Sequence, residues 1–360
     1  MCLLQKEKVL DILLAILLFS AITNGAPQIT KTLNLEEIHL VRCLMYISHR
    51  YFAPSRTVVI SSPAKYRHVQ QEMIAEILRT SIWPIVVTAD GNITIPANSD
   101  FVDRDGSYII LIPDGDIKNF QVEISGLAEQ SFGFTRIWNS ETKFVVAGTN
   151  EFSMSQQRKI FDYFTKLRIY NCIIVTQVHY AIEKEYSSTK MFNDVDTGTK
   201  LGVYTWFPYQ SSDRCTEVND ITLMDSWVIS AQGQFTNNTD LFPRKIRNNL
   251  NECPMKAFVR NVNAPLNTVY VQRNFPNGSS FLYIEGLEYQ LLKEVVQKMN
   301  MKLVHDLTTN DSRLSVETTN KIIGDMAAKE IYIALGGFGT DVLSVRYFDS
   351  TNPYYMTRIR

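Results

Sequence analysis

The sequence predicts a layered α/β fold, in which helices cover sheets of mainly parallel strands. The 360-residue chain is 45% hydrophobic and 20% charged, which is ordinary for a globular protein and allows two domains. Short apolar runs alternate with amphipathic segments between about residues 33 and 180, and a shorter alternation begins near residue 251. This rhythm is typical of strands joined by crossover helices.

The first expected β-α-β unit follows an amphipathic helix at residues 33–53. A strand is predicted at 57–60, and the next helix is expected to begin at Ser62-Pro63, because serine caps helices and proline suits the first turn. Another strand is predicted at 85–88. The unit implies a parallel strand pair with a right-handed crossover.

The same alternation continues to residue 182 and completes an amino-terminal α/β domain at 26–182. A helix is expected to begin at Ser153 or Ser155. Buried strands are predicted at 108–112, 143–147 and 170–176. Residues 183–250, where polar runs alternate with aromatic patches, form a connecting or satellite segment, or else the tail of the first domain.

A second α/β unit is predicted from residue 251 onward. A long loop is expected to end near Tyr283, and a helix follows Gly286. The apolar face of this helix comprises Leu287, Leu291, Leu292, Val295, Val296 and Met299. Strands are predicted at 255–259, 302–304 and 331–335, with a further helix at 316–329.

The amino terminus is expected to be a signal peptide at residues 1–25. Lys6 and Lys8 precede an apolar run at 9–22, and small residues before Gly25 suit signal peptidase. An uncleaved anchor is the alternative, but a run of about 14 residues is short of the roughly 20 that span a bilayer. We therefore expect passage through the secretory pathway.

The cysteines and sequons fit that compartment. After removal of Cys2, four cysteines allow two disulfides in three connectivities. We favour Cys215 with Cys253, which are nearest in sequence, and Cys43 with Cys172 then follows by elimination; a buried free thiol such as Cys172 is the alternative. Glycosylation sequons occur at Asn92, Asn237, Asn277 and Asn310.

Enzyme, metal and nucleic-acid functions lack support in the sequence. A net charge of -1 leaves no field for a phosphate backbone. The five histidines show no metal-binding spacing, and no nucleophile elbow or phosphate-binding loop is present. We expect no catalytic residue, no cofactor and no metal. A secreted α/β enzyme is the least favoured reading.

Several short motifs follow one another in the last part of the chain. They are the segment Leu241–Pro254, then Glu285-Gly286-Leu287-Glu288, Met299-Asn300-Met301, Ile333-Ala334-Leu335-Gly336-Gly337 and Asp349-Ser350-Thr351-Asn352-Pro353-Tyr354-Tyr355. In this order they resemble the ligand-binding domain of arthropod (insect-type) chemosensory ionotropic receptors, divergent relatives of the ionotropic glutamate receptors, and Leu241–Pro254 resembles the entry to that domain. The resemblance covers residues 200–360 and, more loosely, the upstream domain.

The resemblance implies an extracellular amino-terminal domain followed by a periplasmic-binding-protein-like ligand-binding domain of two lobes. Residues 251–360 would be lobe one of an incomplete ligand-binding domain, truncated before the pore and lobe two. Glutamate receptors place a ligand-clamping arginine five residues before the aspartate that matches Asp349. Ser344 occupies that position here and Arg346 lies two residues later, so both are candidate ligand contacts.

The resemblance also implies the function. We expect part of a chemosensory ligand-gated cation channel subunit on the extracellular face of the plasma membrane. It would recognise a small molecule (an odorant, amine or acid) and assemble with other receptor subunits in a hetero-oligomer, without nucleic acid. The alternative is a secreted soluble protein that binds a ligand or modulates longer receptors.

Overall fold

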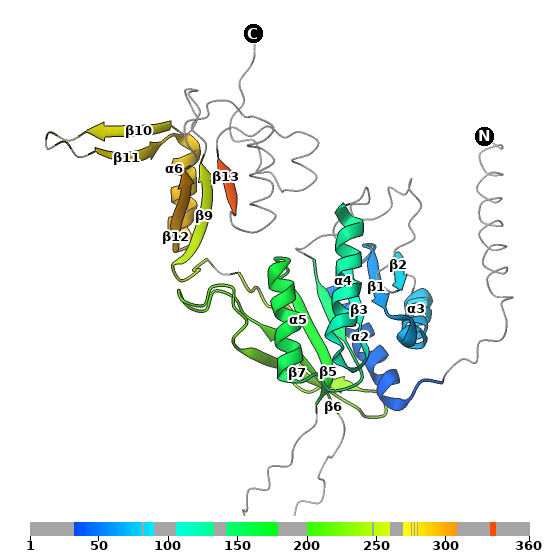
Figure 1. Cartoon of the computed structure of the whole chain (residues 1–360). Coiled ribbons are helices and arrows are strands. Elements are labelled where there is room, and N and C mark those ends of the chain that lie inside the picture. Colours follow the sequence, from blue (N-terminus) through cyan, green and yellow to red (C-terminus); the bar gives the residue numbers. More distant parts are fainter. Residues whose placement is uncertain are drawn as a thin grey trace, which may run out of the picture.

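Two α/β units follow one another along the chain (Figure 1). The computed structural model describes residues 32–80, 83–89, 106–132, 142–178, 200–246, 248–259, 269–274, 276, 278, 280–307 and 332–335.

The first unit is built on one eight-stranded sheet, in the order β2-β1-β3-β4-β5-β6-β7-β8. Pairing is parallel among the first five of these strands and antiparallel from β5 to β8. The strands are β1 (Val58–Ser62), β2 (Ile85–Ala89), β3 (Ser107–Leu111), β4 (Phe144–Ala147), β5 (Cys172–Val178), β6 (Lys200–Trp206), β7 (Ile221–Val228) and β8 (Gln234–Phe235). The mixed α/β class with a large, mainly parallel sheet is therefore confirmed.

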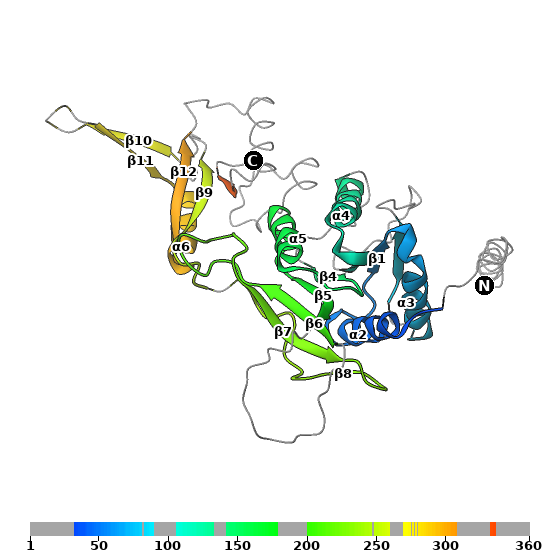
Figure 2. The same cartoon turned by 60° about the horizontal axis from the view of Figure 1, so that its bottom comes forward.

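Among the described residues, four helices cover the two faces of this sheet. They are α2 (Leu35–Tyr51), α3 (Arg67–Thr80), α4 (Ile117–Phe132) and α5 (Met154–Lys166). Buried residues of α2 and α3 share one apolar cluster with one face of the sheet, and those of α4 and α5 share a second cluster with the other face (Figures 1 and 2). Continuous apolar strands such as β3 and β4 follow from this burial on both faces.

The starts of α2 and α3 show how the local sequence determines where a helix begins. Asn34 caps α2 in a capping box: its Oδ1 accepts from the Glu37 amide, and the Glu37 carboxylate accepts from the Asn34 amide. The start predicted at Ser62-Pro63 is wrong in detail: Ser62 still belongs to β1, and its hydroxyl donates to the Pro63 carbonyl. A 3-10 turn, η1 (Ala64–Tyr66), separates Pro63 from α3.

The segment after residue 200 continues the first sheet. Strands β6, β7 and β8 add to it in antiparallel fashion, so they form the tail of this unit. Asp225, which is 2% exposed, accepts hydrogen bonds from the amides of Ser226, Asn237 and Thr239. This carboxylate therefore organises the turn that follows β8.

The second unit contains a three-stranded parallel sheet in the order β12-β9-β13. Its elements are β9 (Cys253–Val259), β10 (Val269–Asn274), β11 (Ser280–Glu285), α6 (Leu287–Lys298), β12 (Met301–Leu307) and β13 (Ile333–Leu335). The long loop expected before Tyr283 is wrong, because β10 and β11 pair there as an antiparallel hairpin. The helix predicted at 316–329 lies outside the described residues.

The apolar face predicted for α6 is only partly buried. Leu292 and Val296 pack on the sheet and are each 5% exposed, whereas Leu287, Leu291 and Val295 lie 38–47% exposed. The apolar arc is wider than the face that one three-stranded sheet covers, which is why the sequence overstates the buried surface.

Candidate functional site

The strand order of the first sheet reverses at β1, which has β2 on one side and β3 on the other. In open α/β sheets a ligand binds beyond the carboxyl ends of the strands at such a switch point. Three described loops meet this edge: 62–67 after β1, 112–117 after β3 and 148–153 after β4. We call these three loops the carboxyl edge.

A chain of buried polar side chains lies directly beneath the carboxyl edge. The Thr88 hydroxyl donates to Ser61 Oγ at 2.7 Å, and the Ser61 hydroxyl donates to Glu123 Oε2. All three residues are at most 1% exposed. Gln70 adds bonds from Nε2 to the carbonyls of Ile60 and Thr88, at 2.9 and 2.8 Å. The ends of β1 and β2 are thereby fixed by side chains from α3 and α4.

A tyrosine-threonine contact joins two loops of the carboxyl edge. The hydroxyls of Tyr66 and Thr149 lie 2.5 Å apart, and the Thr149 amide donates to the Tyr66 hydroxyl at 3.1 Å. Gly148 permits this approach, because a Cβ there would lie 2.5 Å from the Ile112 carbonyl oxygen and 2.6 Å from the Phe152 ring. The loops after β1, β3 and β4 are therefore held at close quarters.

Two helices beginning at the carboxyl edge are capped by their own side chains. Asp116 Oδ1 accepts from the Lys118 amide at 2.9 Å, and Ser153 forms a capping box with Gln156. A ligand at this edge therefore meets hydroxyl, amide and carboxylate groups as well as backbone amides. Such groups recognise small polar molecules by hydrogen bonding.

Nucleophilic catalysis finds no support in these contacts. A serine nucleophile is most often activated by a histidine base within hydrogen-bond reach. His68 is bonded to Glu37 at 2.7 Å, and His39 Nδ1 accepts from the Trp227 indole at 3.4 Å. Ser61 instead donates to the buried carboxylate of Glu123.

The ligand contacts inferred from the sequence, Ser344 and Arg346, lie outside the described residues. The residues of the carboxyl edge went unrecognised in the sequence. A usable signal was present, since Ser61-Ser62 and Gly148-Thr149 each fall at or just after a buried run. Carboxyl ends of parallel strands share one edge, so polar residues there gather in space.

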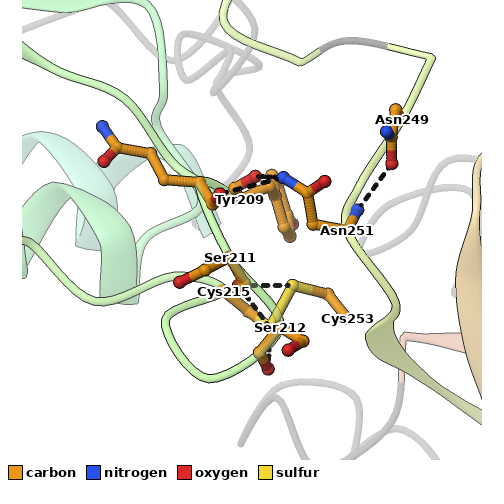
Figure 3. The surroundings of a disulfide bond; sticks show 8 residues. Tyr209, Ser211, Ser212, Cys215, Asn249, Asn251 and Cys253 are labelled. Carbon is orange, nitrogen blue, oxygen red and sulfur yellow. Dashed lines mark hydrogen bonds between the residues drawn. A yellow bond between two sulfur atoms is a disulfide. The ribbon is translucent and has the colours of Figure 1, made fainter.

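A disulfide joins the two units. Cys215, in the β6–β7 loop, is bonded to Cys253 at the start of β9, as predicted (Figure 3). Asn251 Nδ2 supports the same junction by donating to the carbonyls of Tyr209 and Gln210, at 2.7 and 3.0 Å. The chain is therefore tied at the point where it enters the second sheet.

The second predicted disulfide is wrong. Cys43 and Cys172 are both free, and each is fully buried. Cys43 belongs to the apolar cluster under α2, and Cys172 to the cluster on the opposite face of the sheet. The sheet separates the two sulfurs, and burial raises the pKa of both thiols.

Aromatic residues reinforce the junction beside the disulfide. The rings of Tyr170 and Tyr209 lie 6.3 Å apart, and burial raises the pKa of both hydroxyls. The Arg168 guanidinium lies 4.9 Å from the ring of Tyr332, immediately before β13. The Arg168–Tyr332 contact therefore connects the segment after α5 with the second sheet.

The secretory features are described only in part. Asn237 is exposed in the turn after β8, which suits an attached glycan, whereas Asn92, Asn277, Asn310 and the signal peptide lie outside the described residues. Among the residues that the structure describes, no helix has the length and hydropathy to cross a bilayer. The same residues contain no cluster of three or more potential metal ligands.

Comparison with known proteins identifies the family. Residues 31–248, more than half of the chain, match the family model described as "Putative ionotropic receptor, ligand binding domain". The match spans the first sheet with its carboxyl edge and ends just before β9. No curated protein matches the chain. The chain therefore belongs to the ionotropic receptor ligand-binding domain family.

Proposed function

We propose that this chain is the ligand-recognising, extracellular part of a chemosensory ligand-gated cation channel subunit of the insect type. Membership of the family supports a receptor role, and the sequence motifs at residues 241–355 support the chemosensory branch. The ligand is a small molecule such as an odorant, amine or acid, and the subunit works together with other receptor subunits. Binding shifts the receptor toward the state that holds the ligand better.

We place the ligand at the carboxyl edge of the first sheet. The observation that carries this placement is the coincidence of the family match with the switch point of the sheet, where loops after β1, β3 and β4 converge. The Tyr66–Thr149 contact lies in these loops, and the Thr88–Ser61–Glu123 chain supports them from below. A rigid polar frame of this kind lowers the entropic cost of ordering the site on binding.

The signal segment and the sequons imply a maturation route for the chain. The chain enters the secretory pathway through residues 1–25 and carries glycans at the four sequons, of which Asn237 is exposed. In a glycosylated sample, peptide mapping of the Asn237 site by mass spectrometry tests this directly. An unmodified Asn237 in protein secreted from an insect cell would contradict it.

The test of the binding site uses the whole chain in a thermal-shift and calorimetry screen of volatile amines, organic acids and neutral odorants. For a compound that binds, Tyr66→Phe removes the hydroxyl that meets Thr149 and is expected to weaken binding by about tenfold, the effect of losing about 1.4 kcal/mol. Tyr46→Phe is the matched control, because its hydroxyl contacts Asn238 near β8 instead. The Tyr46→Phe variant should bind the compound with the same affinity as the unmodified chain.

A third variant separates this site from the one that the motifs suggest. Arg346→Ala removes the candidate contact predicted from the resemblance and should leave binding at the carboxyl edge unchanged. If Arg346→Ala abolishes binding while Tyr66→Phe does not, the ligand lies in the second unit and the placement at the carboxyl edge is wrong.

A further inference from the structure

Strand β12 forms an edge of the second sheet, because β9 lies between it and β13 (Figures 1 and 2). Within the described part of the chain, β12 pairs with β9 and with no other strand. An edge strand presents a row of backbone N–H and C=O groups that another strand can pair with. Val304, at the middle of β12, is 41% exposed.

A groove lies along the outer flank of this strand. Its volume is about 520 Å³, and it is lined by Tyr289 and Lys293 of α6 and by Leu303 and His305 of β12. Among the described residues, β9 contributes none of the lining, so the groove lies beyond β12 rather than between the two strands. A strand added beside β12 would place alternate side chains into this groove, under α6.

The sequence of β12 is self-complementary in one arrangement. When two copies of Met301-Lys302-Leu303-Val304-His305-Asp306-Leu307 run antiparallel about a twofold axis at Val304, Lys302 lies opposite Asp306 of the partner subunit. Leu303 then lies opposite His305 of the partner subunit, over the groove. A parallel arrangement in register would instead set Lys302 against Lys302 of the partner subunit, which is unfavourable.

We propose that two copies of this chain pair through β12, antiparallel about Val304, and join their three-stranded sheets into one continuous sheet. The edge strand supplies the backbone groups, the charge pattern sets direction and register, and the groove receives side chains of the partner strand. The interface is isologous, so each contact occurs twice. The proposed dimer interface is separate from the ligand site, because β12 lies outside the matched residues 31–248.

A charge exchange tests the register. Sedimentation of the whole chain is expected to show a concentration-dependent dimer, which Lys302→Asp or Asp306→Lys alone weakens about tenfold, since each breaks two symmetric pairs. The double variant Lys302→Asp/Asp306→Lys should restore the dimer to within about threefold. Positions 302 and 306 on one strand are about 13 Å apart, too far to pair with each other, so rescue requires two chains.

Cross-linking tests the twofold axis. Val304→Cys should form an intermolecular disulfide under mild oxidation, because residues facing each other across antiparallel strands have close Cβ atoms. Val295→Cys is the matched control; it is similarly exposed, on the side of α6 away from the groove, and should cross-link far less. A chain that stays monomeric, or a dimer that ignores both the charge exchange and Val304→Cys, would overturn the proposal.

Discussion

At the scale of single residues, two buried nitrogen-bearing side chains of the first unit, His39 and Lys245, each have a defined hydrogen-bond partner. His39 accepts from Trp227, and Lys245 Nζ donates to the Cys172 carbonyl at 3.0 Å. Burial lowers the pKa of both, because a low-dielectric interior disfavours the charged form. None of these partners was predictable from the sequence, since each pair joins residues more than 70 positions apart.

His39 makes the stability of the chain depend on pH. Its side chain is 1% exposed, and burial, together with the nearby Arg42, lowers its pKa in the folded state below the ordinary histidine value of about 6.5. The unfolded chain therefore binds more protons below pH 6.5, so the free energy of unfolding falls as pH falls through the lowered pKa. The slope from one group is at most about 1.4 kcal/mol per pH unit.

The measurement is urea unfolding between pH 7.5 and about pH 5 for the unmodified chain and for His39→Gln. The variant is expected to lose part of the pH dependence, because its amide does not titrate in this range. His49→Gln is the control, since His49 contacts Trp83 at a separate site, with the two rings tilted and their centroids 4.9 Å apart. Equal pH dependence in the His39→Gln variant and the unmodified chain would show that His39 is not the group responsible.

At the scale of elements, the sequence predicts the first five strands and helices α2, α3 and α5, apart from the exact start of α3, because each is a continuous apolar run or a clear helical stripe; it does not predict α4. Helix α5 begins after Ser153, one of the two starts expected, where a capping box is present. The failures have physical causes: the hairpin β10–β11 lacks a simple alternating pattern, and three apolar residues of α6 stay exposed. Buried polar residues such as Asp225 and Ser226 of β7 interrupt the apolar pattern and also hid the strands after β5.

The loop after β4 depends on Gly148. Gly148→Ala would bring a Cβ to 2.5 Å from the Ile112 carbonyl oxygen, a backbone atom that cannot rotate away. We expect the free energy of unfolding to fall by about 1–3 kcal/mol and the loops of the carboxyl edge to shift. Gly278→Ala is the control in denaturant unfolding: nothing lies within 4 Å of its Cβ, so only the cost of its positive φ, about 1 kcal/mol, applies. A Gly148→Ala variant as stable as the unmodified chain would refute the close approach.

At the scale of the whole molecule, the sequence resemblance and the family model both indicate an ionotropic receptor, through different residues. The quoted motifs lie mostly beyond residue 240, whereas the matched model covers 31–248. The assignment of residues 251–360 as lobe one stays a prediction. How the two units join was only partly predictable: the Cys215–Cys253 bond follows from sequence proximity, but the Arg168–Tyr332 contact does not.

The disulfide should contribute measurably to stability. Cys215 and Cys253 are 38 residues apart in sequence, and closing a loop of that length stabilises the folded chain by about 4 kcal/mol in the chain-entropy account. Unfolding in the presence of a reductant should therefore show a loss of up to that amount. The Cys215→Ser/Cys253→Ser variant should show the same loss without reductant and no further change with it, because Cys43 and Cys172 are free. A further loss on reduction of that variant would mean that another disulfide exists.

The most direct test of the central claim is hydrogen exchange of the whole chain with and without a bound small molecule from the screen, read by mass spectrometry. A ligand at the switch point of the first sheet should slow exchange in all three loops of the carboxyl edge, at residues 62–67, 112–117 and 148–153. Unchanged exchange in these loops, with protection confined to the second unit, would contradict the claim that the first sheet carries the ligand site.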